Sequence, residues 1–534
     1  MSRYPRKDVP HNKSLQFGAL IVLFVTLLVS CASPAPSGGG SQTSCSTTTP
    51  SSGLNGTACE STLTPGSTPT PACVPASADA HVAVDLSAPL LTSQFSPGLT
   101  LVDNSLTYPY NDNDLTAINN VEALIHKGIT YISTPIMAWG VDDPWPDPTQ
   151  SEPTNWESLD ARVRLIVQMG GVPVITLSEA PWWMKGVLEP QGTTHQITQS
   201  EEWLDIAYSA RILDNQMGAW LKLVQRVAER YMVPPFNVRY FQVWNELKGY
   251  YDPITNAYDY TTSPGKPDGP NARHGYTYMY NQVYNTLMQV ASSLNVSAGS
   301  VKVGGPYVVM DTWSSTEQSN PSNITKAYGT YDQRSLDVVL YWLQHKVGAG
   351  FITLDSSSSN KDNVNITDPF TAAQKFADAT QWIRSLDPSQ FPGAASLPIW
   401  WAEWYAKPYT NVSDANYNDA VKSYAMIELV KAGSAVALSW GGLGDGPPNT
   451  GLWTNTTAGG GQPLPWYFSY KAFKDDFSSG TRIYATNSSA PNLVEALAAA
   501  TKVMLVNKTA KSVSVTVGCA RVTLSPYQVQ VIAL

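Results

Sequence analysis

The segment GITYISTPIMAWG, Gly128 to Gly140, is followed along the chain by DARVRLIVQMG, Asp160 to Gly170, and then by VPVITLSEAPWW, Val172 to Trp183. The first and last of these are short, continuous apolar runs, which are typical of strands buried on both faces. The middle segment places apolar residues three and four apart, as one face of a helix requires. Two buried strands joined by a helix form a β-α-β unit, and such units build parallel sheets.

The same alternation continues to about residue 445. Six further runs predict strands, at Gly98–Val102, Val238–Glu246, Val301–Val309, Phe351–Ser357, Leu397–Tyr405 and Ala435–Gly442. Helical patterns separate them, at Trp220–Tyr231, Tyr276–Leu294, Ser335–Lys346, Ala372–Leu386 and Tyr417–Ala432. Eight strands with enlarged loops favour an α/β fold, a closed (β/α)8 TIM barrel, over an open doubly wound sheet. An open sheet would be expected to carry a glycine-rich phosphate loop after an early strand, and the sequence has none there.

The pattern changes from about Pro463, where short alternating runs are separated by Asn, Gly and Ser. These runs predict a C-terminal antiparallel β-sandwich, and His81–Ser87, before the barrel, is a candidate for one of its strands. We therefore expect a barrel domain at residues 78–460 and a β-sandwich accessory domain at residues 461–534, with a structural role.

The N-terminus resembles a targeting segment. A basic stretch precedes the apolar run GALIVLFVTLLVS, Gly18 to Ser30, so residues 1–30 are expected to be a signal peptide. The run ends in LVSC, which resembles a bacterial lipobox and predicts lipidation of Cys31; an ordinary signal peptide with a nearby Cys is the alternative. Residues 31–77 are rich in Ser, Thr, Pro and Gly and predict a flexible tether. We expect an exported protein, lipid-anchored at the bacterial surface or envelope, or else secreted.

Composition limits the class of ligand. Only 14% of residues are charged, whereas the chain has 17 Trp and 27 Tyr, which suits neutral ligands. A net charge of -9 without a basic patch argues against nucleic acid as a partner. No CxxC occurs and the six His residues are scattered, so neither a metal nor a cofactor is expected. The disulfide pairing of Cys45, Cys59, Cys73 and Cys519 stays open, as does the oligomeric state.

Two predicted strands end on a glutamate in an aromatic setting. VWNE places Glu246 at the end of the fourth strand, and WWAEW places Glu403 at the end of the seventh. Reactive side chains of a (β/α)8 barrel gather at the carboxyl ends of the strands, so these two carboxylates are expected to face each other over the cavity. Glycoside hydrolysis needs such a pair, one as an acid and one as a nucleophile or base.

These motifs, together with PWWM at Pro181–Met184 and VGGP at Val303–Pro306, resemble the clan A glycoside hydrolases and look most like family 39. The resemblance covers about residues 90–534. It implies a retaining enzyme in which Glu246 is the general acid/base and Glu403 the nucleophile. It further implies that Asn245 hydrogen-bonds the 2-hydroxyl group of the reacting sugar.

One segment departs from the family pattern. Family members often carry a His and a Tyr at the end of the sixth strand, with the Tyr oriented towards the nucleophile, whereas this chain reads FITLDSSSSNKDN. Asp355 in this segment is expected to be a local cap or turn residue. The identity of the sugar is therefore left open.

Aromatic residues near strand ends are candidates for contacts with the sugar, because rings can stack on sugar faces. The residues selected are Trp139, Trp183, Tyr307, Trp404 and Trp440, with Trp440 as the expected platform and Tyr250 and Tyr251 as further polar contacts. The proposed roles also require a raised pKa for Glu246 and an ionised Glu403.

The sequence thus predicts a retaining glycoside hydrolase that acts on a poly- or oligosaccharide by double displacement. Two alternatives stay open: a carbohydrate-binding surface lipoprotein that has lost turnover, and a transglycosidase that uses the same two Glu residues. The linkage cleaved, and whether action is exo or endo, are also undetermined.

Overall fold

The computed structural model describes residues 77–107, 113–266, 273–444 and 446–534. The predicted signal peptide, the lipidation site and all but the last residue of the tether lie outside these ranges, as do Cys31, Cys45, Cys59 and Cys73. They remain predictions. Cys519 is disulfide-bonded. Among the helices of the described ranges, none is both long and apolar enough to cross a membrane.

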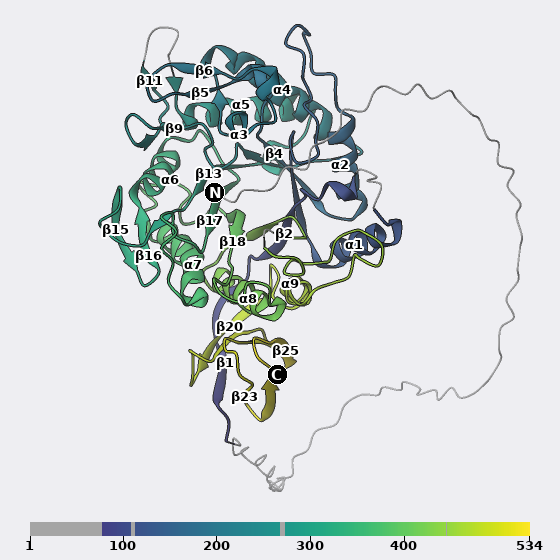
Figure 1. The fold of residues 1–534 in the computed structure, drawn as a ribbon, viewed down its shortest axis with the longest axis vertical. Helices are drawn as coiled ribbons and strands as arrows, with labels where there is room; N and C mark the ends of the chain where they lie inside the picture. Colours follow the sequence, from purple (N-terminus) through teal and green to yellow (C-terminus); the bar gives the residue numbers. More distant parts are fainter. Residues whose placement is uncertain (1–76, 108–112, 267–272, 445) are drawn as a thin grey trace, which may run out of the picture. The chain divides into compact units, whose positions relative to one another are not determined.

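Eight parallel strands close into a barrel, which confirms the predicted fold (Figure 1). In chain order the strands are β2 (Ser96–Thr100), β3 (Tyr131–Pro135), β4 (Val172–Leu177), β8 (Tyr240–Val243), β13 (Lys302–Val309), β17 (Phe351–Ser357), β18 (Ile399–Tyr405) and β19 (Val436–Trp440). Each pairs in parallel with its neighbours, and β19 closes the ring on β2. Strand β8 ends earlier than predicted, so Glu246 lies three residues beyond it, in the following loop.

Helices surround the barrel. They are α1 (Leu115–Gly128), α2 (Glu157–Gln168), α4 (Met217–Tyr231), α5 (Tyr276–Ser293), α6 (Gln333–His345), α7 (Pro369–Ser385), α8 (Ala415–Lys431) and α9 (Pro465–Asp476). In α4 the buried face follows the pattern read from the sequence, with Trp220, Val224 and Val227 buried. Helix α9 packs against α1 and β2 of the barrel, although it lies beyond residue 460, where the accessory domain is predicted to begin.

Small sheets enlarge three of the loops at the carboxyl ends of the strands. The loop after β4 carries β5 (Lys185–Leu188), β6 (Thr194–Gln196), α3 (Asp205–Tyr208) and β7 (Arg211–Ile212). The loop after β8 carries β9 (Tyr251–Asp252), β10 (Ala257–Tyr258), β11 (Pro264–Lys266) and β12 (Arg273–His274), and the loop after β13 carries β14 (Thr312–Trp313), β15 (Pro321–Lys326) and β16 (Gly329–Asp332). These loops form the rim above the strand ends, where active sites of this fold lie.

Aromatic rings fill the opposite end of the barrel. Phe351 stacks on Trp400 with 4.1 Å between ring centroids, and Tyr240 stacks on Trp400 at 5.5 Å. Together with Val174, Val436 and Leu438 they form a compact buried cluster. The amino end of the barrel is therefore closed by packing.

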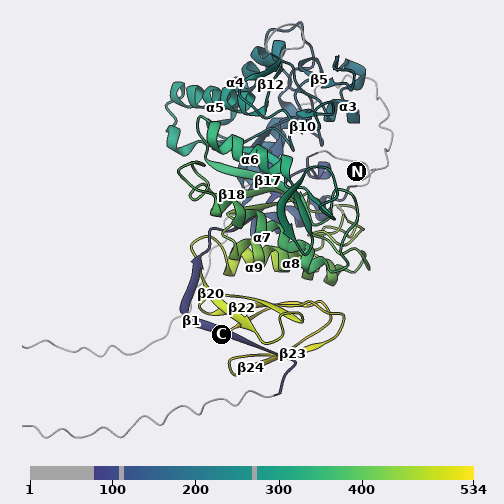
Figure 2. The ribbon, with the colours of Figure 1, turned by 90° about the vertical axis from the view of Figure 1, so that its left-hand side faces the viewer.

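A seven-stranded sheet forms the second part of the structure, as predicted (Figure 2). Its order is β24-β23-β1-β20-β21-β22-β25, with bounds β1 (Ala80–Thr92), β20 (Arg482–Ser488), β21 (Val494–Ala498), β22 (Lys502–Asn507), β23 (Val513–Val517), β24 (Ala520–Leu524) and β25 (Val529–Ala533). The candidate strand from before the barrel is thus confirmed as β1. One buried cluster of Val, Leu and Ala side chains lies inside this sheet region.

The sheet shares the main hydrophobic core with the barrel. Met504 and Val506 of β22 belong to the same buried cluster as the barrel side chains, and α8 packs against β22 and β25. Figure 2 shows α8 and α9 between the barrel and the sheet. The two parts are therefore held together by a continuous apolar core.

Gly304 of β13 provides a test of this packing. A methyl group there would overlap the ring of Phe351, its cross-strand partner, so Gly304→Ala is expected to lower the free energy of unfolding by about 1–3 kcal/mol. Urea unfolding followed by tryptophan fluorescence measures the change. Gly218→Ala is the matched control, because nothing lies within 4 Å of a methyl group at that position in α4 and the change should cost nothing. A wild-type midpoint for Gly304→Ala would contradict the described packing.

Candidate active site

The loop after β8 carries the motif WNE into the cleft. Trp244, Glu246 and Leu247 all have a positive φ, at 69°, 44° and 53°, so the chain turns sharply here. The Trp244 ring packs edge-on against Trp220 of α4, with centroids 5.7 Å apart, and its Nε1 donates to the Lys248 carbonyl at 2.8 Å. The buried tryptophan thus fixes a strained turn that holds Glu246 above the end of the strand.

Three carboxyl groups meet at the strand ends. One oxygen each of Glu246, Asp355 and Glu403 lies within 4.8 Å of the other two. The predicted pairing of Glu246 with Glu403 across the barrel mouth is therefore present in the geometry. Asp355 and Glu403 are register partners on the neighbouring strands β17 and β18, which brings the third carboxyl group to the same point.

Asp355 corrects a sequence-based expectation, since it is neither a cap nor a turn residue. It lies within β17, is 1% exposed, and is hydrogen-bonded to Glu246. Its Oδ1 is buried without a hydrogen bond to any described residue. Burial, and next the negative charges of Glu403 and Glu246, raise its pKa well above the ordinary value, which favours the protonated form of this carboxyl group.

Two tyrosine hydroxyl groups hold Glu403. Tyr405 donates to Oε1, and Tyr307 donates to Oε2 at 3.3 Å. Tyr405 follows Glu403 by two residues in β18, so both side chains leave the same face of the strand. Tyr307, selected from the sequence as a sugar contact, thus contacts Glu403 in the described structure, and its contact with a sugar stays a prediction. The two hydroxyl groups that contact Glu403 thus come from β13 and β18.

Lys248 is a charged residue of the site that the sequence analysis missed. Its ammonium group forms an ion pair with Oε2 of Glu246 and lies 4.7 Å from the centroid of the Tyr208 ring. Burial favours a raised pKa for Glu246, but the Lys248 charge and the hydrogen bond from Asp355 outweigh it and leave the pKa below its ordinary value.

Glu403 shows the opposite shift. Burial, and next the negative charge of Glu246, raise the pKa of Glu403 to about 8, against the opposing effect of Tyr405, Lys248 and Tyr307. The expectation of a raised pKa for Glu246 and an ordinary one for Glu403 is thus wrong for the unliganded protein. The reason is that Lys248 pairs with one carboxylate of a buried cluster, and the sequence does not show with which.

Asn245 and two of the predicted aromatic residues form a connected wall beside the carboxyl groups. Asn245 donates from Nδ2 to the Tyr208 hydroxyl at 3.1 Å, and its Oδ1 is buried without a partner among the described residues. The Tyr208 ring packs edge-on against Trp139 at 5.4 Å, and Trp139 against Trp440 at 5.0 Å. Both tryptophans are partly exposed, so their rings are available to a ligand.

The remaining predicted aromatic residues, except Tyr251, lie in packed surroundings. Trp183 is 7% exposed and donates from Nε1 to the Trp145 carbonyl at 2.9 Å. Trp404 is 4% exposed and packs against Phe376 and Trp466. Tyr250 is buried between Trp244 and Tyr276, and Tyr251 is exposed and donates to Asn256.

A further buried glutamate lies after β4. Glu179 ends the run VITLSE with φ 59° and pairs with Lys185 at 3.5 Å, and burial raises its pKa to about 7. The charge of Glu246 acts on it as well. A glutamate at a strand end in an aromatic setting is the same signal that Glu246 and Glu403 carry, so the sequence contains a signal for this residue as well.

The three carboxyl groups are close enough together to ligate a cation. The ammonium group of Lys248 already contacts Glu246, so a fixed positive charge lies at this point of the cleft. The site thus carries its own counter-charge.

Comparison with known proteins gives similarity of fold. No family model matches the chain, and no curated protein matches it. Among solved structures, the chain is similar to SrfJ from Salmonella typhimurium, with a TM-score of 0.51, 11% identity and coverage of 85% of this chain and 92% of that one. This similarity agrees with the barrel and the attached sheet described above.

Two further solved structures are enzymes named as glycoside hydrolases. A GH39 β-xylosidase from Caulobacter crescentus is 16% identical, with a TM-score of 0.46 and coverage of 82% and 83% of the two chains. A glycoside hydrolase family 30 subfamily 8 xylanase from Clostridium acetobutylicum is 12% identical, with a TM-score of 0.48 and coverage of 84% and 98%. The first of these two is named as a family 39 enzyme.

The pair of partly buried Glu202 and buried Asp143 supports a prediction on stability. Burial, and next the hydrogen bond and charge of Asp143, raise the pKa of Glu202 to about 9, whereas a glutamate in an unfolded chain titrates near about 4.3. Between these values the folded protein holds a proton that the unfolded chain has lost, so the free energy of unfolding falls as pH rises from about 5 to 9.

Glu202→Gln removes this titration and keeps a donor for Asp143. We expect the variant to lose less stability than the wild type between pH 5.5 and 8.5, and to have a Tm a few degrees higher at pH 8.5. Thermal unfolding at several pH values measures this. The exposed Glu317→Gln is the control and should behave like the wild type. An unchanged pH dependence in Glu202→Gln would contradict the assignment.

Proposed function

We propose that this protein is a retaining glycoside hydrolase that cleaves O-glycosidic bonds of a poly- or oligosaccharide. The observation that carries the proposal is the approach of Glu246, in the loop after β8, and Glu403, in β18, to within 4.8 Å. Carboxyl groups about 5–5.5 Å apart are typical of retaining enzymes, whereas inverting enzymes need about 6.5–9.5 Å to admit a water molecule. The gap here supports attack by a carboxylate.

Glu403 is proposed as the nucleophile. In the first step, one of its oxygens forms a bond to the anomeric carbon while the bond from that carbon to the leaving oxygen breaks. The hydroxyl groups of Tyr405 and Tyr307 hold the two Glu403 oxygens and so orient the carboxylate before attack. The product is a glycosyl ester on Glu403.

Glu246 is proposed as the acid and base. It protonates the departing oxygen in the first step, and in the second it takes a proton from the water that hydrolyses the ester. Asp355 keeps a proton beside Glu246, because it is hydrogen-bonded to that carboxylate and its pKa is well above the ordinary value. The proton that reaches the leaving oxygen therefore comes from Asp355 and passes through Glu246, which is an anion again once the ester has formed.

In the second step, the charges on Glu403 and Glu246 favour proton uptake by Glu246. Once Glu403 is esterified it carries no charge, so its repulsion of Glu246 disappears and Lys248 stabilises Glu246 as an anion. An anionic Glu246 is the form that accepts a proton from water. The ion pair with Lys248 thus favours hydrolysis of the ester.

The wall of Asn245, Tyr208, Trp139 and Trp440 is the proposed sugar subsite. The buried Oδ1 of Asn245 lacks a partner among the described residues, so a hydroxyl group of the sugar would satisfy it. The partly exposed rings of Trp139 and Trp440 offer apolar faces beside it. An uncharged sugar ring suits this wall.

The two roles can be separated with azide. Glu246→Ala and Glu403→Ala should each lower turnover of aryl glycosides by a factor of about 100 or more. Azide needs no general base, so it should reactivate Glu246→Ala and give a glycosyl azide with the anomeric configuration of the substrate. With Glu403→Ala, azide should replace the carboxylate and give the inverted product. Proton NMR of the anomeric centre measures the outcome.

If Glu246→Ala gave the inverted glycosyl azide and Glu403→Ala the retained one, the roles assigned to the two residues would be reversed. Near-normal turnover of an accepted substrate by Glu403→Ala, without azide, would contradict the proposed function itself. Glu317→Ala, at an exposed position, is the control variant and should have the turnover of the wild type.

Lys248 provides a test by pH. Its charge lowers the pKa of both Glu246 and Glu403, so Lys248→Met should raise both. If Glu403 must be ionised to attack, kcat/KM of the wild type rises with pH towards about 8. In Lys248→Met this rise should move to higher pH by about one pH unit.

Steady-state rates on one aryl glycoside between pH 5 and 10 measure the effect. Lys248→Arg keeps the positive charge and should leave the profile near that of the wild type. Identical profiles for Lys248→Met and the wild type would show that the lysine does not control the ionisation of the pair.

A further inference from the structure

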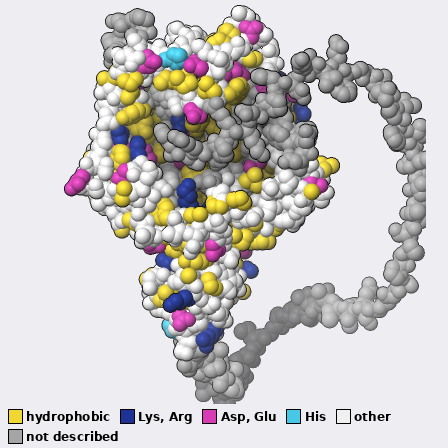
Figure 3. Space-filling model, viewed as in Figure 1, with side chains coloured by type: hydrophobic (Ala, Val, Ile, Leu, Met, Phe, Trp, Pro, Cys, Tyr) yellow, Lys and Arg dark blue, Asp and Glu magenta, His cyan; other side chains and the backbone are white. Residues whose placement is uncertain are grey.

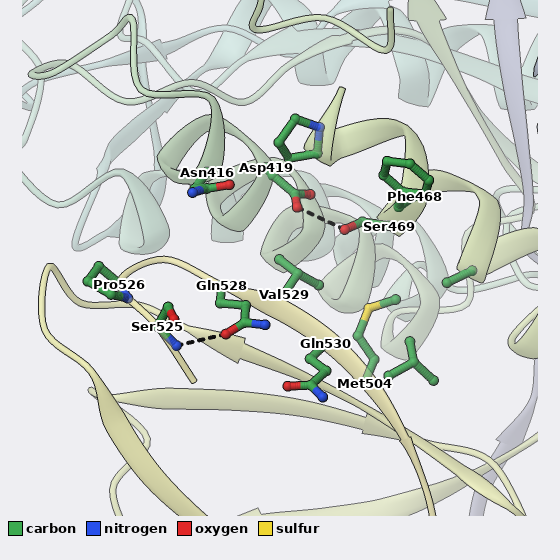
Figure 4. Close-up of a pocket in the computed structure, with 13 residues that line it drawn as sticks. Asn416, Asp419, Phe468, Ser469, Met504, Ser525, Pro526, Gln528, Val529 and Gln530 are labelled. Carbon is green, nitrogen blue, oxygen red and sulfur yellow. Dashed lines mark hydrogen bonds between the residues drawn. The ribbon is translucent and has the colours of Figure 1, made fainter. Parts of the chain in front are cut away.

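A second cavity lies on the outer side of the barrel, where α8 and α9 face the sheet (Figure 4). Its volume is about 550 Å³. Asn416 and Asp419 of α8 and Phe468 of α9 line one side, and Gln528 and Gln530 line the other. The cavity is separate in the fold from the carboxyl groups, which lie at the strand ends inside the barrel ring.

Uncharged hydrogen-bonding groups line this junction cavity. The side-chain amides of Asn416 and Gln530 make no hydrogen bond with another described residue. Gln528 accepts from the Ser525 backbone N–H at 2.7 Å through Oε1, which leaves its amide N–H groups available. Among the described residues that line the cavity, none is Lys, Arg or His. A ligand with many hydroxyl groups and no charge matches these donors and acceptors.

The single acidic side chain does not change this character. Asp419 is 5% exposed and accepts from Ser423 Oγ at 2.9 Å and Ser469 Oγ at 3.0 Å. Burial raises its pKa to about 6. Its oxygens are thus already hydrogen-bonded within the protein, and it does not present a bare charge to the cavity.

Phe468 adds an apolar wall. It is 60% exposed, although a phenylalanine is ordinarily buried, and its ring lies at the edge of the cavity (Figure 4). Pro465, Pro526 and Val529 extend the apolar surface. A ring face beside several amide groups matches a sugar, whose C–H face is apolar and whose hydroxyl groups form hydrogen bonds.

Both walls are held in place before a ligand binds. The Tyr417 ring of α8 stacks on Tyr527, next to Gln528, with 4.1 Å between centroids. Met504, in the floor, belongs to the core that the barrel and the sheet share. A cavity with fixed walls costs little entropy on binding.

We infer that the junction cavity is a second saccharide-binding site, for a neutral oligosaccharide, outside the catalytic cleft. Cavities of about 300–1,000 Å³ hold ligands of drug size, and two or three sugar units fall in that range. Phe468 stacks on one sugar face, while Asn416, Gln528 and Gln530 bond to the hydroxyl groups. The site tethers a neutral polysaccharide to the protein independently of cleavage.

Isothermal titration of the full chain with xylotriose, cellotriose and mannotriose tests the inference. At least one should bind, and Phe468→Ala should weaken its binding about 10-fold. Gln530→Ala should also weaken it, with an unchanged Tm in both variants. Trp440→Ala, in the catalytic cleft, and Trp203→Ala, which removes an aromatic residue 57% exposed elsewhere, should leave this binding event unchanged.

Failure of all three trisaccharides to bind, or equal binding by Phe468→Ala and the wild type, would overturn the inference. Tighter binding of trigalacturonic acid than of the neutral sugars, lost in Phe468→Ala, would overturn the neutral class. Turnover of a small aryl glycoside should be the same in Phe468→Ala and the wild type. If the protein binds a neutral trisaccharide at this site but turns over no glycoside, the proposed function is contradicted, whereas the inference of a second binding site is supported.

Discussion

The meeting of three buried carboxyl groups with one lysine is the constraint on which the chemistry of this protein depends. Glu246, Asp355 and Glu403 cannot all be ionised within 4.8 Å of one another, because each added negative charge is opposed by the others and by burial. Lys248 provides one positive charge, and the tyrosine hydroxyl groups provide neutral donors. The number of protons bound to the three carboxyl groups therefore depends on all of the charges in the cluster together. The carboxyl group that holds each proton changes during the reaction.

Charged side chains line one side of the surrounding cleft, and aromatic rings line the other. On one side, Glu179 and Lys185 extend the ionic network behind Glu246. On the other, Tyr208, Trp139 and Trp440 form a chain of edge-to-face rings. On the face seen in Figure 3, basic side chains are scattered and do not gather into one patch, which agrees with an uncharged ligand.

Much of the fold could be predicted from the sequence, because its eight strands are continuous apolar runs and its helices have regular apolar spacing. Glu246 and Glu403 were found because each ends such a run. Asp355 and Lys248 were not, since their importance comes from register between β17 and β18 and from the sharp turn after Trp244, neither of which leaves a periodic signal. Tyr405 was recoverable, because a residue two positions from Glu403 in a strand must share its face. The direction of the pKa shifts was not, because it depends on which carboxylate Lys248 reaches.

The position of β1 has a consequence for the order of folding. Val82 of β1 pairs with Ser488 of β20 and with Val517 of β23, so the strand made first has partners made last. At about 5–20 residues per second, a ribosome would need on the order of 20–80 s to add the intervening chain. The barrel can begin to close during that time, whereas the first strand of the sheet must wait with unpaired edges, so the sheet is expected to form last and to join the two ends of the folded chain only when synthesis is nearly complete.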